Sequence, residues 1–223
     1  MFNTFSSLFL ILANVIPLVG VLFFGWDAVL VLALFWIENL IIGVYNLIKM
    51  LAVSVFRSQW SKLGLTLFFV IHYGLFWTGH GLLLWNLLGF ESIDPAQVLG
   101  IQGEGPLELF LEGFAIMMSF IERYDPVIWL GLGGLVMSHG VAFIERFILA
   151  GELFKKSVNQ LMTEPYKHVL MLHAGLMAGA FILTKVGSPL WLLAVIVLIK
   201  MLVDARQHIT ANIQHSTSGQ LTK

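Results

Sequence analysis

The sequence predicts an all-α membrane protein with six transmembrane helices, and three observations lead to this fold class. Of the 223 residues, 58% are apolar and only 11% carry a formal charge, whereas soluble domains are about 45–50% apolar and about 25% charged. The mean hydropathy is +0.89. The apolar residues gather in runs of about 20, which is the length that a helix needs to cross a bilayer core of about 30 Å.

This composition excludes several classes of function. A soluble enzyme with this composition would lack the charged surface side chains that keep a protein dispersed in water. A net charge of −1 provides no basic surface for nucleic acid, so no nucleic-acid partner is expected. The chain contains no cysteine, which excludes disulfides, thiolate metal sites and iron–sulfur clusters. The partner that the composition implies is the lipid bilayer.

Six apolar runs are long enough to span a membrane. They cover residues 5–24, 28–55, 63–88, 127–149, 166–185 and 189–208. The first run lacks a basic n-region and leads directly into the second, so we expect it to stay in the mature protein and not to act as a signal peptide. No repeat and no Ser-rich or Gly-rich linker divides the chain, which predicts one transmembrane domain over residues 1–223 with a polar tail at 210–223.

Lys and Arg gather in the link between the second and third runs, in the link between the fourth and fifth, and in the tail. Their cations include Arg57, Lys62, Lys155, Lys156 and Arg206. The link between the third and fourth runs carries seven acidic residues and one cation. The positive-inside rule therefore places both termini on the cytoplasmic side.

Residues 106–121 form a shorter apolar run that contains Glu108 and Glu112. A span at this place would break the alternation of basic and acidic loops. We therefore interpret the run as an amphipathic helix that lies in the outer membrane interface. A plain acidic loop is the alternative.

Polar side chains recur at one depth in five of the six predicted spans. The depth follows from the span midpoints and a rise of about 1.5 Å per residue. Ionisable groups at this depth are costly and usually face the interior of a helix bundle, so the layer is the candidate site. It consists of Glu38, Asn39, His72, Ser138, His139, His173 and Lys200.

Three imidazoles and a carboxylate in this layer predict an intramembrane metal site. We expect His72, His139 and His173 to be metal ligands, since Zn²⁺ and non-haem iron both accept such groups. Glu38 would be the fourth ligand or the catalytic general base. Zn²⁺ would activate water for hydrolysis of a lipid or other lipophilic substrate, and iron would open oxidative chemistry. A b-type haem held by two of the histidines is a minor alternative.

Other functions fit the same residues. In a proton- or metal-coupled transporter, Glu38, Lys200 and the histidines would relay protons or bind a substrate at the midplane. In a non-catalytic assembly protein, the polar layer would only fix the pairing of helices, with Glu38 bound to Lys200 and the histidines as interior hydrogen bonders. The sequence is compatible with an enzyme, a transporter or an assembly protein, and with a homo-oligomer.

A second polar group lies near the inner ends of the last three predicted spans. It includes Glu145, Arg146, His168, Asp204, Arg206 and His208. We interpret this group as an ion-pair network at the helix ends. A cytoplasmic gate is the alternative interpretation.

Short strings in the chain carry a resemblance. They are the run from Trp36 to Leu40, the run from His72 to Gly74, His80 with Gly81, His139 with Gly140, and the run from Glu145 to Phe147. Together they resemble an uncharacterised family of bacterial integral membrane proteins, which is defined by a domain of unknown function covering the whole chain. The resemblance implies a location in the bacterial cytoplasmic (inner) membrane and implies no established activity.

Overall fold

The computed structural model describes residues 25–90 and 105–166, together with residues 21, 23, 100, 169–171, 173–175, 194, 195, 197 and 198. The chain divides into two compact units, Leu32–Leu170 and a second unit that combines Met1–Val31 with Met171–Lys223. Every regular element in the described residues is a helix. The predicted runs at 5–24, 166–185 and 189–208 lie largely outside the described residues, and the tail at 210–223 lies wholly outside them.

In the described part of the chain, three helices are long and apolar enough to cross a membrane. Helix α2 covers Ala28–Phe56, α3 covers Leu63–Leu87 after the short 3-10 turn η1 at Trp60–Lys62, and α6 covers Val127–Ala142 and continues as the π-helical segment η2 at Phe143–Leu149. These helices correspond to the second, third and fourth predicted runs. Their ends lie within one residue of the predicted ends, because the length of the apolar run decides where each helix stops.

Helices α2 and α3 pack against each other around a pair of indoles. The rings of Trp36 and Trp77 are stacked, with centroids 4.6 Å apart and an interplanar angle of 2°. The Nε1 of Trp36 donates to the carbonyl oxygen of Trp77 at 2.9 Å, and the Nε1 of Trp77 donates to the carbonyl oxygen of Trp36 at 3.3 Å. Gly81 lies directly against the Trp36 ring, where a Cβ would collide with it. A glycine on α3 therefore sets how closely the two helices approach.

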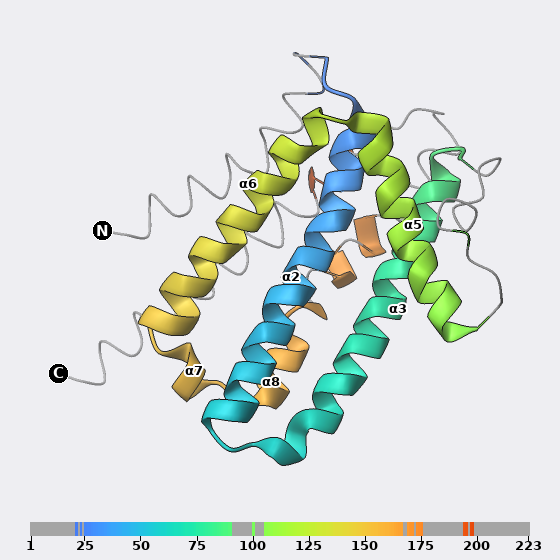
Figure 1. The fold of residues 1–223 in the computed structure, drawn as a ribbon. Coiled ribbons are helices and arrows are strands. Elements are labelled where there is room, and N and C mark those ends of the chain that lie inside the picture. The colour runs from blue at the N-terminus through green and yellow to red at the C-terminus, as the bar shows by residue number, and fades with distance from the viewer. Residues whose placement is uncertain are drawn as a thin grey trace. The chain divides into compact units, whose positions relative to one another are not determined.

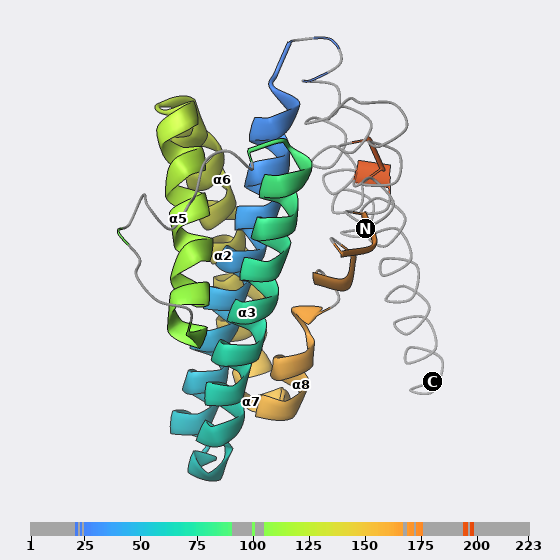
Figure 2. The ribbon, with the colours of Figure 1, turned by 90° about the vertical axis from the view of Figure 1, so that its right-hand side faces the viewer.

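Helix α5, Pro106–Tyr124, lies beside α3 and runs in the same direction (Figures 1 and 2). Phe110 contacts Gly74, and the rings of Phe120 and Trp85 have centroids 5.4 Å apart. The residue numbers thus rise together along the two helices. The amphipathic run expected at 106–121 is a helix, and it packs lengthwise on α3.

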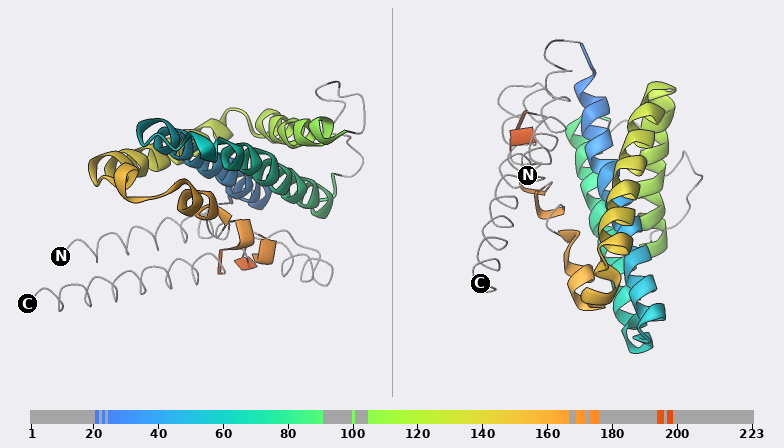
Figure 3. Two further views of the ribbon diagram at one scale, coloured as in Figure 1. Left: turned by 90° about the horizontal axis from the view of Figure 1, so that it is seen from below. Right: turned by 90° about the vertical axis from the view of Figure 1, so that its left-hand side faces the viewer.

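Two short helices, α7 at Glu152–Lys155 and α8 at Val158–Thr163, follow η2 at the end of the bundle where α2 and α3 are joined (Figure 3). Gly151 adopts a φ of +74°, which lets the chain reverse after η2. A core cluster of buried hydrophobic residues connects these helices to α2, α3 and η2. It consists of Met50, Val53, Phe69, Tyr73, Phe147, Val158, Leu161 and Val169.

Candidate functional site

The structure brings together two residues of the predicted polar layer, Glu38 of α2 and His139 of α6. The Oε1 of Glu38 lies 3.3 Å from the Nε2 of His139. The Glu38 side chain is 16% exposed and the His139 side chain is 27% exposed. Both residues lie well inside helices that are long and apolar enough to cross a membrane. The pair is therefore an ionisable contact between two candidate membrane spans.

Contacts on either side of the pair hold α6 against α2. The hydroxyl of Tyr45 donates to the carbonyl oxygen of Val136 at 3.0 Å, and the Tyr45 ring lies 6.5 Å from the His139 ring. Gly131 lies against Leu34, where a Cβ would collide with the leucine side chain. These contacts fix the backbones on which Glu38 and His139 are carried.

Asn39 adds an available hydrogen-bond acceptor next to Glu38. Its Nδ2 donates to the backbone carbonyl oxygen of Phe35 at 2.9 Å. Its backbone carbonyl oxygen accepts a hydrogen bond from the hydroxyl of Tyr73 at 2.8 Å. Its Oδ1 is buried and has no hydrogen-bond partner among the residues that the structure describes. An unpaired buried amide oxygen costs about 1–3 kcal/mol. The Oδ1 can accept a donor from a ligand without breaking an existing bond.

His72 has a different partner. Its Nδ1 lies 2.7 Å from the hydroxyl of Tyr166, and its ring lies between those of Phe68 and Phe76, at 5.1 and 5.0 Å. His80, two turns further along α3, donates from Nδ1 to the carbonyl oxygen of Phe76 at 2.6 Å. Phe and His thus alternate along one face of α3. Sequence reasoning missed Tyr166, for which the linear pattern carries no signal.

The predicted metal site has two of its donors in contact. Within the part of the chain that the structure describes, no group of three or more His, Asp or Glu side chains is arranged to hold a metal ion. Glu38 and His139 supply one carboxylate oxygen and one imidazole nitrogen, which are suitable donors for Zn²⁺ or iron. His173 belongs to the other compact unit. Lys200 lies outside the described residues.

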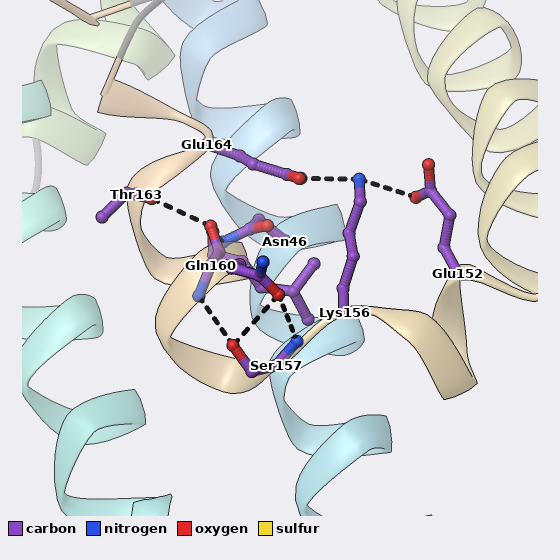
Figure 4. Close-up of polar contacts among 8 residues, drawn as sticks. Asn46, Glu152, Lys156, Ser157, Gln160, Thr163 and Glu164 are labelled. Atoms are coloured by element: carbon purple, nitrogen blue, oxygen red, sulfur yellow. Dashed lines mark hydrogen bonds and ion pairs between the residues drawn. The ribbon is translucent and has the colours of Figure 1, made fainter. Parts of the chain in front are cut away.

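The polar network beyond α6 is built from residues that sequence reasoning did not single out as a group. Lys156 lies between Glu152 and Glu164, with Nζ to oxygen distances of 3.0 and 2.6 Å (Figure 4). Burial lowers the pKa of Lys156, but the two carboxylates outweigh it and raise the pKa above its ordinary value. Arg57 Nη1 donates to the carbonyl oxygen of Lys156 at 2.6 Å. The spacing of Glu152 and Lys156 by four residues is the signal that could have predicted this pair.

Of the six residues predicted to form an ion-pair network at the helix ends, the structure describes two. Glu145 and Arg146 lie in the π-helical segment η2 and are exposed. His168, Asp204, Arg206 and His208 lie outside the described residues.

Comparison with known proteins gives a family and no activity. The chain belongs to the family of unknown function DUF6498, whose model matches residues 1–220. This confirms the resemblance carried by the strings around Glu38, His72 and His139. No curated protein matches the chain. No solved structure matches it either.

Proposed function

We propose that this DUF6498 protein is a proton-coupled transporter of the bacterial cytoplasmic membrane, in which Glu38 and His139 bind and release the coupling proton. The observation that carries the proposal is the 3.3 Å contact between Glu38 Oε1 and His139 Nε2, made by two helices that are long and apolar enough to cross a membrane. A polar contact of this kind at membrane depth is a common mark of a proton or substrate pathway.

The chemistry of the pair suits it to carry a single proton. One proton shared by the two side chains gives either a carboxylate with an imidazolium or a carboxylic acid with a neutral imidazole. Both forms have no net charge, so both avoid the high cost of an isolated charge in the membrane. Gain or loss of one proton leaves a net charge that an accompanying solute or a movement of α6 would have to compensate. Proton binding is thereby coupled to transport.

Measurement of proton flux in proteoliposomes tests this function. Wild-type protein should dissipate an imposed pH gradient in the presence of its solute, and Glu38→Gln and His139→Gln should each reduce the rate at least tenfold. Glu145→Gln serves as the control. It removes an exposed carboxylate in η2, the continuation of the helix that carries His139. Equal rates in Glu38→Gln and Glu145→Gln would contradict the proposal.

The proposal includes a membrane topology of six spans, with both termini on the cytoplasmic side. The distribution of loop cations supports it. Because the chain has no cysteine, single cysteines report the sidedness of each loop directly. Gln102→Cys should react with an impermeant thiol reagent added outside, and Ser157→Cys should not. The reverse pattern would refute this topology.

A metal-dependent enzyme that acts on a lipid or other lipophilic substrate is the second candidate, and the same distance favours it. Two ligands about 2.1 Å from a tetrahedral metal lie about 3.4 Å apart, close to the 3.3 Å between Glu38 Oε1 and His139 Nε2. A charge-assisted hydrogen bond is usually shorter, about 2.7–2.9 Å. In this case His72 and His173 would be the further ligands of Zn²⁺ or iron, with Glu38 as ligand or general base.

Elemental analysis of the purified protein separates the two candidates. A metal centre predicts stoichiometric Zn or Fe that is lost in His139→Ala. It predicts no loss in His80→Ala, because His80 lies two turns beyond His72 on α3 and therefore at a different depth. If the purified protein contains no bound metal and still transports protons, the transporter is the candidate that remains.

A further inference from the structure

Lys49 lies on the stripe of α2 that meets α6 and its continuation η2. The same stripe carries Leu34, Glu38 and Tyr45, each of which contacts α6. Lys49 follows Glu38 by eleven residues, which places it about 16 Å further along α2. Its Nζ lies over the Phe147 ring of η2, 5.9 Å from the ring centroid. The contact between the two helices thus ends with a cation against a buried ring.

Lys49 and Arg146 are the first Lys or Arg side chains along their helices. Residues 28–48 of α2 and residues 127–145 of α6 and η2 contain no Lys and no Arg. The fold brings Lys49 and Arg146 close enough to act on each other electrostatically. Like charges repel, and Lys49 is half-buried, so that water screens its charge incompletely. A negatively charged group bound to both side chains would offset this repulsion.

Two carboxylates also act on Lys49, but both are bound to another cation. They belong to Glu152 and Glu164, and they lie 3.0 and 2.6 Å from the Nζ of Lys156 (Figure 4). Over the ranges 25–90 and 105–166, no carboxylate lies at ion-pair distance from Lys49 or Arg146. We call these five charged residues the Lys49 cluster. The cluster carries three positive charges against two negative ones.

Large apolar side chains beside the cluster in the sequence are strongly exposed. Ile148 and Leu149 follow Arg146 in η2 and are 52% and 75% exposed, and Phe154 of α7 is 69% exposed. A soluble anion bound to the cluster would leave these side chains uncovered. A phospholipid brings an anionic headgroup and apolar chains together, so it matches both kinds of side chain.

We propose that the Lys49 cluster binds the phosphate group of one anionic phospholipid, with Lys49 and Arg146 as the side chains that contact it. A phosphodiester carries a single negative charge, which balances the excess positive charge of the cluster, and both cations form strong hydrogen bonds with phosphate oxygens. Arg146 lies in the π-helical segment η2, and such segments are rare and are frequently found at functional sites. The proposal does not depend on whether Glu38 and His139 carry a proton.

Native mass spectrometry of the full-length protein in detergent tests the site. The probes are phosphatidylglycerol, which has a net negative charge, and phosphatidylcholine, which has none. Wild-type protein should bind phosphatidylglycerol at least about fivefold more tightly than phosphatidylcholine. Arg146→Gln should weaken the binding of phosphatidylglycerol about fivefold, and Lys49→Gln should weaken it at least as much. Equal affinity of wild-type protein for the two lipids would overturn the proposal.

Lys62→Gln is the matched control, because it removes an exposed cation in η1 and changes the net charge by the same amount. It should leave the binding of phosphatidylglycerol nearly unchanged. A loss as large as that of Arg146→Gln would show that only the total charge matters and would refute a site at Lys49. Lys49→Arg keeps the charge and should retain the lipid, which separates lost binding from lost folding. Arg146 is exposed, so its replacement tests the site even if Lys49→Gln fails to fold.

Inorganic phosphate distinguishes a lipid headgroup from a soluble anion. We expect that added phosphate does not displace phosphatidylglycerol from wild-type protein, because the acyl chains contribute to lipid binding. If phosphate binds in a manner that requires Lys49 and Arg146 while phosphatidylglycerol does not, the cluster is a site for a soluble anion and the lipid proposal is wrong.

Discussion

Helix α2 makes two very different contacts, one with α3 and one with α6. Against α3, the indoles of Trp36 and Trp77 stack and exchange two hydrogen bonds with backbone carbonyls. Against α6, the polar contacts are the Glu38–His139 pair and a hydrogen bond from Tyr45 to a backbone carbonyl. The first contact is held by large buried rings. The second is held by partly exposed polar groups.

This difference indicates which contact can change during function. Moving α3 along α2 would break stacking and leave two buried N–H groups unpaired, which costs several kcal/mol. Moving α6 would separate one partly exposed pair whose attraction depends on protonation. The α2–α3 contact is therefore expected to be the rigid part, and the α2–α6 contact the part that responds to a proton.

The largest expected effect comes from a change that breaks the rigid contact. Gly81→Ala places a methyl group against the Trp36 ring and should lower the free energy of unfolding by about 3 kcal/mol, since overpacking forces the ring or the backbone to move. Gly79→Ala, two residues away on α3 with open space around it, is the control. It should be neutral or stabilising by up to about 1 kcal/mol. Thermal or denaturant unfolding in detergent measures both, and equal losses would contradict the expected role of Gly81.

The next effect tests the hydrogen bonds of the same contact. Trp36→Phe removes the Nε1 donor but keeps a ring in the stack, and it should cost about 1–2 kcal/mol because the hydrogen bond to the carbonyl oxygen of Trp77 is lost. Trp77→Phe should cost a similar amount. The double variant should cost less than the sum if the two bonds act together. Strict additivity in a double-mutant cycle would show that each indole acts alone.

The sequence predicts part of this contrast and not the rest. The ends of α2, α3 and α6 follow from the lengths of apolar runs, and the shared depth of Glu38 and His139 follows from their positions in those runs. The position of α5 does not, because it depends on glycines such as Gly74 and Gly113 that admit rings from a neighbouring helix. Hydrophobic periodicity carries no information on such contacts. The Tyr166 partner of His72 also depends on how the chain folds back after η2.

The contact with α6 should show a small effect on stability and a large effect on function. Glu38→Gln keeps the shape of the side chain and a hydrogen bond to His139, and it should lower the free energy of unfolding by less than about 1 kcal/mol. The same change removes a titrating group, so pH-dependent proton uptake should be lost. Infrared difference spectra across a pH titration measure that uptake in the purified protein. A variant as unstable as Gly81→Ala would show that the pair is structural.

The smallest effect is expected for the ion pairs of Lys156, which lie outside the membrane-spanning helices and extend the comparison to a contact in water. Its partners are Glu152 and Glu164, and partly exposed pairs of this kind contribute about 0.5 kcal/mol or less. The pKa of Lys156 is raised in the folded protein above 10.5. The group therefore stabilises the fold fully below about pH 10.5, and this contribution disappears as the pH rises through the folded pKa. The difference in unfolding free energy between wild type and Lys156→Met should be constant from about pH 8 to about pH 10 and shrink above that. A difference that grows with pH would mean that the carboxylates do not favour the charged form of Lys156.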